Sequence, residues 1–192
     1  AEARAPYVGA VDADDYVAPN MFSQLLEGTA NGYYDIVACG FARVDAFGTV
    51  LSRSMENRCG LENIQANVNI FSMINPSFWN KIWRRSLFID NNISFPERLF
   101  YEDAATTPFV LLYAKSLNMI GGTPYMYVQR PGSIINSFGD RHIIEYLRVL
   151  DAVKEGLEYR GVYSKHKKNF DRYVTSQFNY LAQNVAGNPN IS

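Results

Sequence analysis

Cysteine is scarce in this sequence, and its scarcity excludes two classes of small crosslinked protein. The 192 residues include only Cys39 and Cys59. A structural zinc site needs a full set of ligands at paired spacing, and a disulfide framework needs several cysteine pairs. Two isolated cysteines instead fit a reducing cytosol, where they act as small buried apolar side chains. We therefore expect a cytoplasmic protein.

An excess of charge of one sign is also missing, as is a long hydrophobic run. Eighteen basic residues face 19 acidic ones, and the net charge is −1, so we expect no binding to nucleic acid. No apolar stretch approaches the roughly 20 residues that span a bilayer. We also expect no signal peptide. The expected protein is soluble and has at most a peripheral association with membranes.

Apolar and aromatic residues, by contrast, are plentiful. They make up 47% and 14% of the sequence, which is enough to bury the core of one domain with room for an appendage. Short strands and short helices are both expected before residue 138. These are strands over 7–11 and 35–41, a helix from Pro19 to Asn31, a turn at Phe47 and Gly48, helical segments over 63–73 and 86–90, and two strands within 116–130. Tyr125 and Tyr127 share one face of the last strand.

From about residue 140 the pattern changes to two long amphipathic helices. Apolar positions recur at helical spacing in both segments, and they are Ile143, Leu147, Leu150 and Leu157 in the first and Phe170, Val174, Phe178, Leu181 and Val185 in the second. Such a pair cannot bury both apolar stripes alone. We expect it to pack as a hairpin against the preceding region or against a second copy of the chain.

An acidic cluster follows the first apolar run directly. Asp12, Asp14 and Asp15 stand after the strand expected over 7–11, and open α/β sheets bind ligands beyond such strand ends. Three neighbouring carboxylates repel one another unless a positive charge lies between them. Hard divalent cations such as Mg²⁺ or Mn²⁺ prefer oxygen ligands. The cluster therefore predicts a metal that holds a phosphorylated substrate.

A second acidic pair, Glu102 and Asp103, precedes the apolar stretch 109–113. Acidic residues in a first helical turn often serve only the helix dipole, so a helix-start role and a catalytic role both remain open. Pro108 adds a further alternative, because it is suited to the first position of a helix with Thr107 as its cap. Glu102 and Asp103 would then lie in the loop before that helix.

Five motifs in this order resemble the second half of a bacterial family 2 glycosyltransferase of the GT-A fold. They are residues 7–15, 35–40, 80–85, the pair 95–97 and 101–103, and the pair 125–127 and 130–134. The match runs from the first residues to about Ser137. It implies an α/β fold, a partial GT-A-like mixed sheet with flanking helices and a C-terminal helical hairpin. The implied domains are a catalytic part over 1–138 and a helical extension over 139–192.

The resemblance also implies an activity and a set of site residues. The activity is metal-assisted inverting transfer, with Mn²⁺ or Mg²⁺, from a nucleotide diphosphate-sugar to a carbohydrate or lipid-linked acceptor in the synthesis of bacterial cell-surface polysaccharide. The metal motif would consist of Asp14 and Asp15 with Asp12, and Asp103 would be the general base. Substrate contacts are assigned to Asn80, Lys81, Glu102, Arg130 and Ser133. We expect the nucleotide-binding half that such enzymes carry first to be missing from this sequence, and we therefore expect the chain alone to be inactive.

Other interpretations of these residues stay open. Lys81 could be an ordinary surface or capping cation, and Arg130 could belong to a simple turn. Asp12 and Asp14 also resemble the start of an aspartate-dependent phosphohydrolase, although Tyr16 stands where such enzymes have Thr or Val. An EF-hand is excluded, because Val17 occupies the position of the loop glycine. The remaining alternative is a non-catalytic module that oligomerises through its C-terminal helices.

Overall fold

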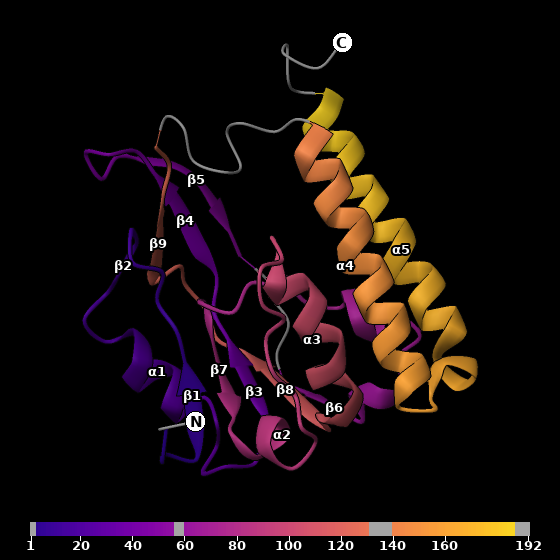
Figure 1. The fold of residues 1–192 in the computed structure, drawn as a ribbon. Coiled ribbons are helices and arrows are strands. Elements are labelled where there is room, and N and C mark those ends of the chain that lie inside the picture. The colour runs from indigo at the N-terminus through magenta and orange to yellow at the C-terminus, as the bar shows by residue number, and fades with distance from the viewer. Residues whose placement is uncertain (1–2, 56–59, 131–139, 187–192) are drawn as a thin grey trace. The chain divides into compact units, whose positions relative to one another are not determined.

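The computed structural model describes residues 3–55, 60–130 and 140–186, and the chain divides into two compact units. The first, named the sheet unit, comprises Ala1–Ile64, Phe78–Asn92 and Tyr113–Pro131. The second, named the helical unit, comprises Gln65–Ser77, Ile93–Leu112 and Gly132–Ser192. All strands found in the described residues belong to the sheet unit, and the long helices belong to the helical unit (Figure 1).

The larger sheet of the sheet unit has the strand order β1-β7-β3-β8-β6. Neighbouring strands are antiparallel except β3 and β8, which are parallel. The strands are β1 Tyr7–Gly9, β3 Ile36–Ala38, β6 Leu61–Glu62, β7 Lys81–Arg84 and β8 Ser116–Met119. The central strand β3 is completely buried, as expected for an apolar run with no polar alternation.

The smaller sheet has the order β2-β9-β4-β5 and is also mixed, because β4 and β9 are parallel and the other neighbours antiparallel. Its strands are β2 Tyr16–Val17, β4 Phe41–Val44, β5 Val50–Ser54 and β9 Tyr125–Val128. Gly48, with φ 84°, forms the expected turn between β4 and β5. Two mixed sheets and a C-terminal helix pair confirm the fold class that the sequence predicts.

Helix α1 (Met21–Glu27) supports the larger sheet. Its buried residues Met21 and Leu25 belong to the same core cluster as Val37 of β3 and Ile82 of β7. The second helix of this unit, α2 (Ser86–Ile89), is short, as predicted. Both helices are confirmed, but α1 is shorter than the range expected from Pro19 to Asn31, and Phe22 and Leu26 of the predicted apolar face are exposed.

The single strand expected over 35–41 is wrong. The structure divides it into β3 and β4, which belong to different sheets. The change of sheet occurs at Gly40, where a Cβ would lie 2.5 Å from the Ser54 carbonyl oxygen and 2.7 Å from that of Gly122. Only glycine allows the backbones to approach so closely.

The helical unit contains η2 (Ile70–Ser72), α3 (Glu102–Tyr113), α4 (Asp140–Tyr159) and α5 (Tyr163–Ala186), while the short turn η1 (Ile64–Ala66) lies at the unit boundary. Helices α4 and α5 contact each other and run side by side (Figure 1). The helical segment expected over 63–73 is wrong, because only the short turns η1 and η2 form there. Asn67 explains the interruption: its side-chain oxygen accepts the Asn69 N–H at 2.8 Å and competes with helical hydrogen bonding.

The two long helices are confirmed, but their buried faces differ from the predicted stripes. Leu147 and Phe178 are 43% and 47% exposed. Tyr146 and Val149 are buried instead, because α4 packs against α3 as well as α5: Val149 joins Ala104 and Ala105 in one cluster, and Tyr146 joins Leu181 in another. A helix with two neighbours buries a wider face than one apolar stripe.

The helices after residue 139 form a compact unit together with 65–77 and 93–112. The assignment of 1–138 to a catalytic domain and 139–192 to an extension stays a prediction. Among the described residues, the helices are all too short or too polar to cross a membrane.

Candidate active site

The loop between β1 and β2 contains the acidic cluster. We name residues 12–15 the acidic loop. Its backbone forms a tight turn, in which the Asp15 N–H donates to the Asp12 carbonyl oxygen at 3.1 Å. Asp12 and Asp14 are exposed, whereas Asp15 is half-buried. The turn therefore separates two carboxylates that face solvent from one that faces the protein.

Asp15 is held by strand β9. The Tyr125 hydroxyl donates to Asp15 Oδ2 at 2.7 Å and the Val128 N–H donates to Oδ1 at 2.8 Å. The same tyrosine oxygen accepts the Asp12 N–H at 3.1 Å. Burial raises the pKa of the Asp15 carboxyl, and the two hydrogen bonds partly oppose this increase. Asp15 thus fixes the loop to the sheet.

Tyr125 is itself fixed by an aromatic cluster. Its ring stacks on Trp79 with the ring centroids 4.2 Å apart, and Tyr127 stacks on the same indole at 5.4 Å. Phe41 meets Trp79 edge-on at 5.0 Å. The predicted common face of Tyr125 and Tyr127 is confirmed. Burial raises the pKa of Tyr125, so its hydroxyl remains a donor to Asp15.

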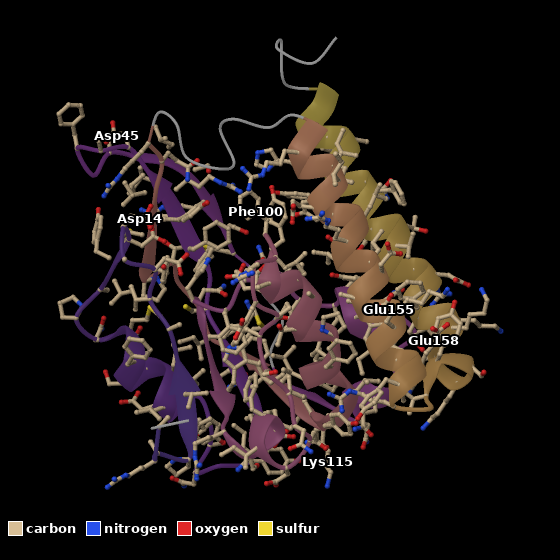
Figure 2. All side chains as sticks on the ribbon, viewed as in Figure 1. Asp14, Asp45, Phe100, Lys115, Glu155 and Glu158 are labelled. Atoms are coloured by element: carbon tan, nitrogen blue, oxygen red, sulfur yellow. The ribbon has the colours of Figure 1, made fainter. Side chains whose placement is uncertain are left out.

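The exposed side of the acidic loop borders an open pocket of about 480 Å³. Asp14, Tyr16, Asp45, Phe47 and Arg130 are among the residues that line it, and Figure 2 shows Asp14 and Asp45 on the same side of the sheet unit. The Arg130 guanidinium donates to the Asp14 carbonyl oxygen at 3.3 Å. The pocket therefore combines two carboxylates, one guanidinium and two aromatic rings.

Asp45 lies at the tip of the hairpin between β4 and β5. Its Oδ1 accepts the backbone N–H groups of Phe47 at 2.9 Å and Thr49 at 2.8 Å. Hydrogen bonds from the backbone, with that of Thr49 the largest cause, hold the pKa of Asp45 below its usual value. Asp45 is therefore ionised at neutral pH and adds a fixed negative charge to the pocket.

The acidic loop does not fit a metal site made of protein ligands alone, but it fits one that is completed by a phosphorylated ligand. The described residues contain no group of three or more His, Cys, Asp or Glu side chains that could hold a metal ion. Carboxylates are nevertheless hard oxygen donors, and Mg²⁺ is often bound by one or two carboxylates together with substrate phosphates. The donors of the loop thus fit a divalent cation shared with a phosphorylated ligand.

Asn80 and Lys81, expected as substrate contacts, are both buried, and Lys81 is only 1% exposed. The Asn80 amide donates to the Cys39 carbonyl oxygen at 2.6 Å and accepts a hydrogen bond from Lys81 Nζ. Lys81 Nζ also lies 6.0 Å from the centroid of the Trp83 ring. The alternative of an ordinary surface cation is therefore wrong for Lys81. Ser133 lies outside the described residues.

Glu102 and Asp103, named here the Glu-Asp turn, form the first turn of α3. Asp103 Oδ1 accepts the Ala104 N–H at 2.7 Å, while Glu102 is exposed. Pro108 lies inside the helix, so the alternative in which the helix starts at Pro108 is wrong. A carboxylate in the first turn of a helix interacts favourably with the helix dipole. This contact supports a helix-start role, and a catalytic role for Asp103 stays a prediction.

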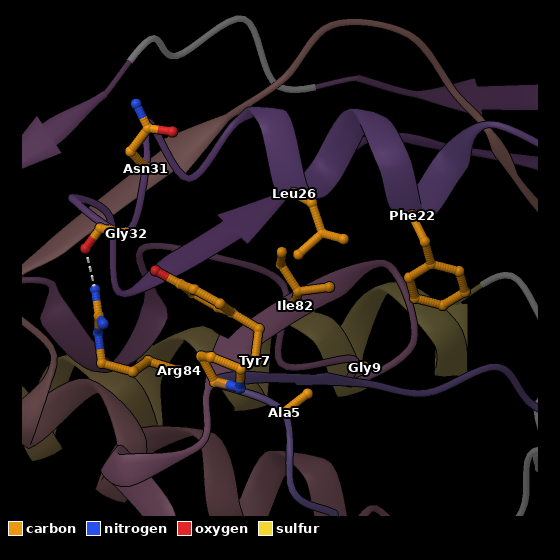
Figure 3. Close-up of a pocket in the computed structure, with 10 residues that line it drawn as sticks. Ala5, Tyr7, Gly9, Phe22, Leu26, Asn31, Gly32, Ile82 and Arg84 are labelled. Carbon is orange, nitrogen blue, oxygen red and sulfur yellow. Dashed lines mark hydrogen bonds between the residues drawn. The ribbon is translucent and has the colours of Figure 1, made fainter.

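A second pocket, of about 440 Å³, is lined mostly by apolar groups beside β1 and α1. Figure 3 shows Tyr7, Phe22, Leu26 and Ile82 around it, with the Arg84 guanidinium hydrogen-bonded to the Gly32 carbonyl oxygen. None of the site residues expected from the sequence lines this pocket. The described residues that line it include no Asp, Glu, His, Cys or Lys side chain.

The sequence did not indicate that Tyr125 holds the acidic loop. Its partner Asp15 is 110 residues away along the chain, and no local pattern connects the two. The alternation of Tyr125 with Tyr127 was the available signal, and it predicts a strand face rather than a partner.

Comparison with known proteins gives relatives named as glycosyltransferases. No family model matches the sequence. The chain is 26% identical over 196 aligned positions to "Uncharacterized glycosyltransferase EpsJ" of Bacillus subtilis, covering 98% of this chain and 57% of that protein. It is 23% identical over 184 positions to "Putative glycosyltransferase EpsH" of the same bacterium, covering 90% and 52%. The chain thus spans about half the length of these curated relatives.

A solved structure has the same fold. The crystal structure of S. aureus TarS 1–349 in complex with UDP-GlcNAc matches with a TM-score of 0.58 and 23% identity, over 81% of this chain and 49% of that chain. At this identity the likeness concerns the fold alone. The predicted GT-A-like fold is confirmed, and the resemblance to glycosyltransferases is confirmed in the curated relatives.

Proposed function

We propose that the protein carrying this chain is an inverting glycosyltransferase that moves a sugar from a nucleotide diphosphate-sugar to an acceptor hydroxyl. The observation that carries the proposal is the exposed Asp14 carboxylate on an anchored loop at the end of β1, within a fold shared with TarS. The TarS crystal structure contains UDP-GlcNAc. The curated relatives named as glycosyltransferases add support along nearly the whole chain.

The proposed reaction is a single displacement at the anomeric carbon. The acceptor oxygen forms a bond to that carbon while the bond from the carbon to the diphosphate oxygen breaks, and the leaving diphosphate keeps the electron pair. Asp103 takes the proton of the acceptor hydroxyl. General-base catalysis of this kind contributes typically about 10²–10⁴-fold in rate. The hydrogen bond from the Ala104 N–H holds the Asp103 carboxylate in one orientation.

The acidic loop would bind the diphosphate end of the donor. Asp14 and Asp12 present carboxylates to Mg²⁺ or Mn²⁺, and Asp15 holds the loop through Tyr125; the metal-ligand role of Asp15 stays a prediction. A divalent cation would neutralise negative charge on the leaving diphosphate. Arg130, next to the Asp14 backbone, adds a cationic contact to a phosphate.

The remaining substrate contacts that we propose come from both units of the chain. Asn80 and Lys81 form a buried polar pair beside β3, Glu102 is the exposed member of the Glu-Asp turn, and Ser133 completes the set predicted from the sequence. The acceptor is proposed to be a carbohydrate or a lipid-linked sugar of a bacterial surface polysaccharide. A cytoplasmic location with peripheral membrane association fits such an acceptor.

The activity is proposed for the protein that carries this chain, since the chain covers 57% of its relative EpsJ. We expect the chain by itself to bind a nucleotide weakly, to transfer no sugar and to form a dimer or larger assembly. Titration calorimetry with UDP and Mn²⁺, together with light scattering, tests these expectations. Tight nucleotide binding by a monomer would contradict them.

The test of the proposed function is a transfer assay with the protein that carries this chain. UDP-, GDP- and dTDP-linked hexoses are offered with Mn²⁺ and a panel of saccharide acceptors, and nucleoside diphosphate release is measured. We expect release that depends on acceptor, and a product with inverted anomeric configuration in NMR spectra.

Two results would contradict this function and favour the alternatives. Hydrolysis of a phosphate monoester such as p-nitrophenyl phosphate, without sugar transfer, would favour an aspartate-dependent phosphohydrolase. No turnover of either substrate class and no nucleotide binding would favour a non-catalytic module. Transfer with retained configuration would exclude the single displacement and the role of Asp103 as base.

A further inference from the structure

The loop that leads into the Glu-Asp turn has an uncommon backbone. Arg98 has φ 58° and Tyr101 has φ 61°, and non-glycine residues rarely adopt such left-handed conformations. They persist where surrounding contacts hold them, often at functional sites. Tyr101 immediately precedes Glu102 and Asp103. Whatever holds Tyr101 therefore also sets the direction from which α3 starts.

Helix α4 supplies the contacts that hold Tyr101. The Tyr101 hydroxyl and His142 Nδ1 are hydrogen-bonded at 2.7 Å, and both His142 and Tyr146 are buried. The rings of Tyr101 and Tyr146 lie with their centroids 4.2 Å apart. One residue earlier, the Phe100 N–H donates to Glu145 Oε2 at 3.4 Å. Three contacts, to His142, Glu145 and Tyr146, thus connect the loop to one face of α4 within little more than one helical turn.

Helix α5 supplies a further contact inside the first turns of α3. Pro108 has no N–H, so the helix cannot satisfy the carbonyl of Ala104, four residues earlier. The buried Tyr173 hydroxyl donates to that Ala104 oxygen at 2.7 Å. Ala104 is also the residue whose N–H binds Asp103 Oδ1. The hydrogen bond from α5 therefore acts on the residue that orients Asp103.

We propose that His142 and Tyr173 are positioning residues for the Glu-Asp turn, so that the C-terminal helix pair works as part of the active site rather than as an appended extension. The proposal rests on the proposed function, in which Asp103 is the general base. His142 fixes the backbone at Tyr101 before the turn, and Tyr173 fixes Ala104 after it. A base displaced by about 1 Å can cost on the order of 10²-fold in rate.

The test compares two substitutions of one residue in the protein that carries this chain. His142→Leu replaces the imidazole that is hydrogen-bonded to the Tyr101 hydroxyl by an apolar side chain, whereas His142→Asn keeps a polar atom near the place of Nδ1. We expect His142→Leu to lower kcat by about 10–10²-fold with KM for the donor nearly unchanged, and His142→Asn to restore most of kcat. Tyr173→Phe, which deletes one oxygen atom, is expected to lower kcat in the same way.

A second measurement separates this proposal from the proposed function. Hydrogen exchange of the backbone amides of residues 102–106 reports the order of the turn without any turnover. We expect these amides to exchange faster in His142→Leu and Tyr173→Phe. Their exchange rate should be unchanged in the control Tyr159→Phe, which alters an exposed tyrosine of α4. Faster exchange with unchanged kcat would overturn the positioning role. Unchanged exchange would overturn it as well, and absence of transfer in the unsubstituted protein would instead overturn the proposed function.

Discussion

The acidic loop and the Glu-Asp turn each hold one carboxylate in place, but different parts of the molecule anchor them. In each, one carboxylate accepts a backbone N–H and its neighbour faces solvent: Asp15 beside Asp14 in the loop, and Asp103 beside Glu102 in the turn. The loop is anchored by a strand, through Tyr125 and the β9 backbone. The turn is anchored by side chains of α4 and α5, including His142.

The difference indicates how each carboxylate can serve in the proposed reaction. The backbone of strand β9, which is paired on both sides in the smaller sheet, gives the loop a rigid base from which an exposed Asp14 can meet a cation and a diphosphate. Side chains on two helices give the turn a position that depends on residues far along the chain. We therefore expect binding of the donor to depend on the loop, and the rate of the chemical step to depend on the turn.

The largest expected effect is on the rate, at Asp103. Asp103→Asn keeps the shape of the side chain and an oxygen that can accept the Ala104 N–H, but the amide cannot accept a proton. We expect kcat of the protein that carries this chain to fall by about 10²–10⁴-fold, with donor affinity unchanged in calorimetry. A loss of thermal stability with little change of kcat would assign Asp103 to the helix start alone.

The next effect, at Asp14, concerns donor binding. Asp14→Ala removes an exposed carboxylate and leaves the anchor at Asp15 intact, so the fold should be unchanged. We expect metal-dependent binding of UDP to be lost, on the scale of the 10–100-fold affinity changes typical of altered metal sites. Calorimetry with and without Mn²⁺ measures it. Equal Mn²⁺-dependent binding by the variant would remove Asp14 from the metal site.

Local patterns predicted the fold well because most of its elements are set by neighbours in sequence. The strand after residue 7 and the helix containing Met21 and Leu25 follow directly from apolar spacing. The prediction failed where the backbone of a distant segment decides the outcome. Gly40 divides an apolar run between two sheets because Ser54 and Gly122 lie against it, and the run itself gives no sign of them.

In the candidate site, too, local sequence predicts some features, and residues far along the chain decide the others. The sequence predicted which carboxylates cluster, because Asp12, Asp14 and Asp15 are adjacent. It could not predict which of them is anchored, since the anchor is a tyrosine of β9. The alternative start of α3 at Pro108 is wrong because Tyr173, a residue of another helix, satisfies the carbonyl that Pro108 leaves without a helical donor.

A third prediction tests the anchor of the acidic loop. Tyr125→Phe keeps the ring that stacks on Trp79 and deletes the hydroxyl that donates to Asp15. Leaving a partly buried group without its partner costs about 1–3 kcal/mol. We expect a loss of that size in the free energy of unfolding, measured by urea denaturation. Tyr16→Phe, which removes the hydroxyl of an exposed tyrosine of β2, is the control and should change stability less.

The smallest expected effect concerns the pH dependence of stability at two carboxylates of the sheet unit. Hydrogen bonds hold the pKa of Asp45 below its ordinary value, so its contribution to stability is complete above the ordinary value of about 3.9 and is lost as pH falls through the lowered pKa. Burial raises the pKa of Asp15. Its contribution is therefore present below about 3.9 and is lost as pH rises through the raised pKa.

The effects of replacing the two carboxylates by asparagine, which does not titrate, should thus change with pH in opposite directions. Relative to the unsubstituted chain, Asp45→Asn should lose stability at pH 7 and regain it near pH 3. Asp15→Asn should lose more stability at low pH than at pH 7, because asparagine avoids the cost of burying a charge. Melting temperatures from pH 3 to 7 measure both differences. If the two variants followed the same trend with pH, the anchored loop and the exposed hairpin tip would not differ in the way that their hydrogen bonds and burial indicate.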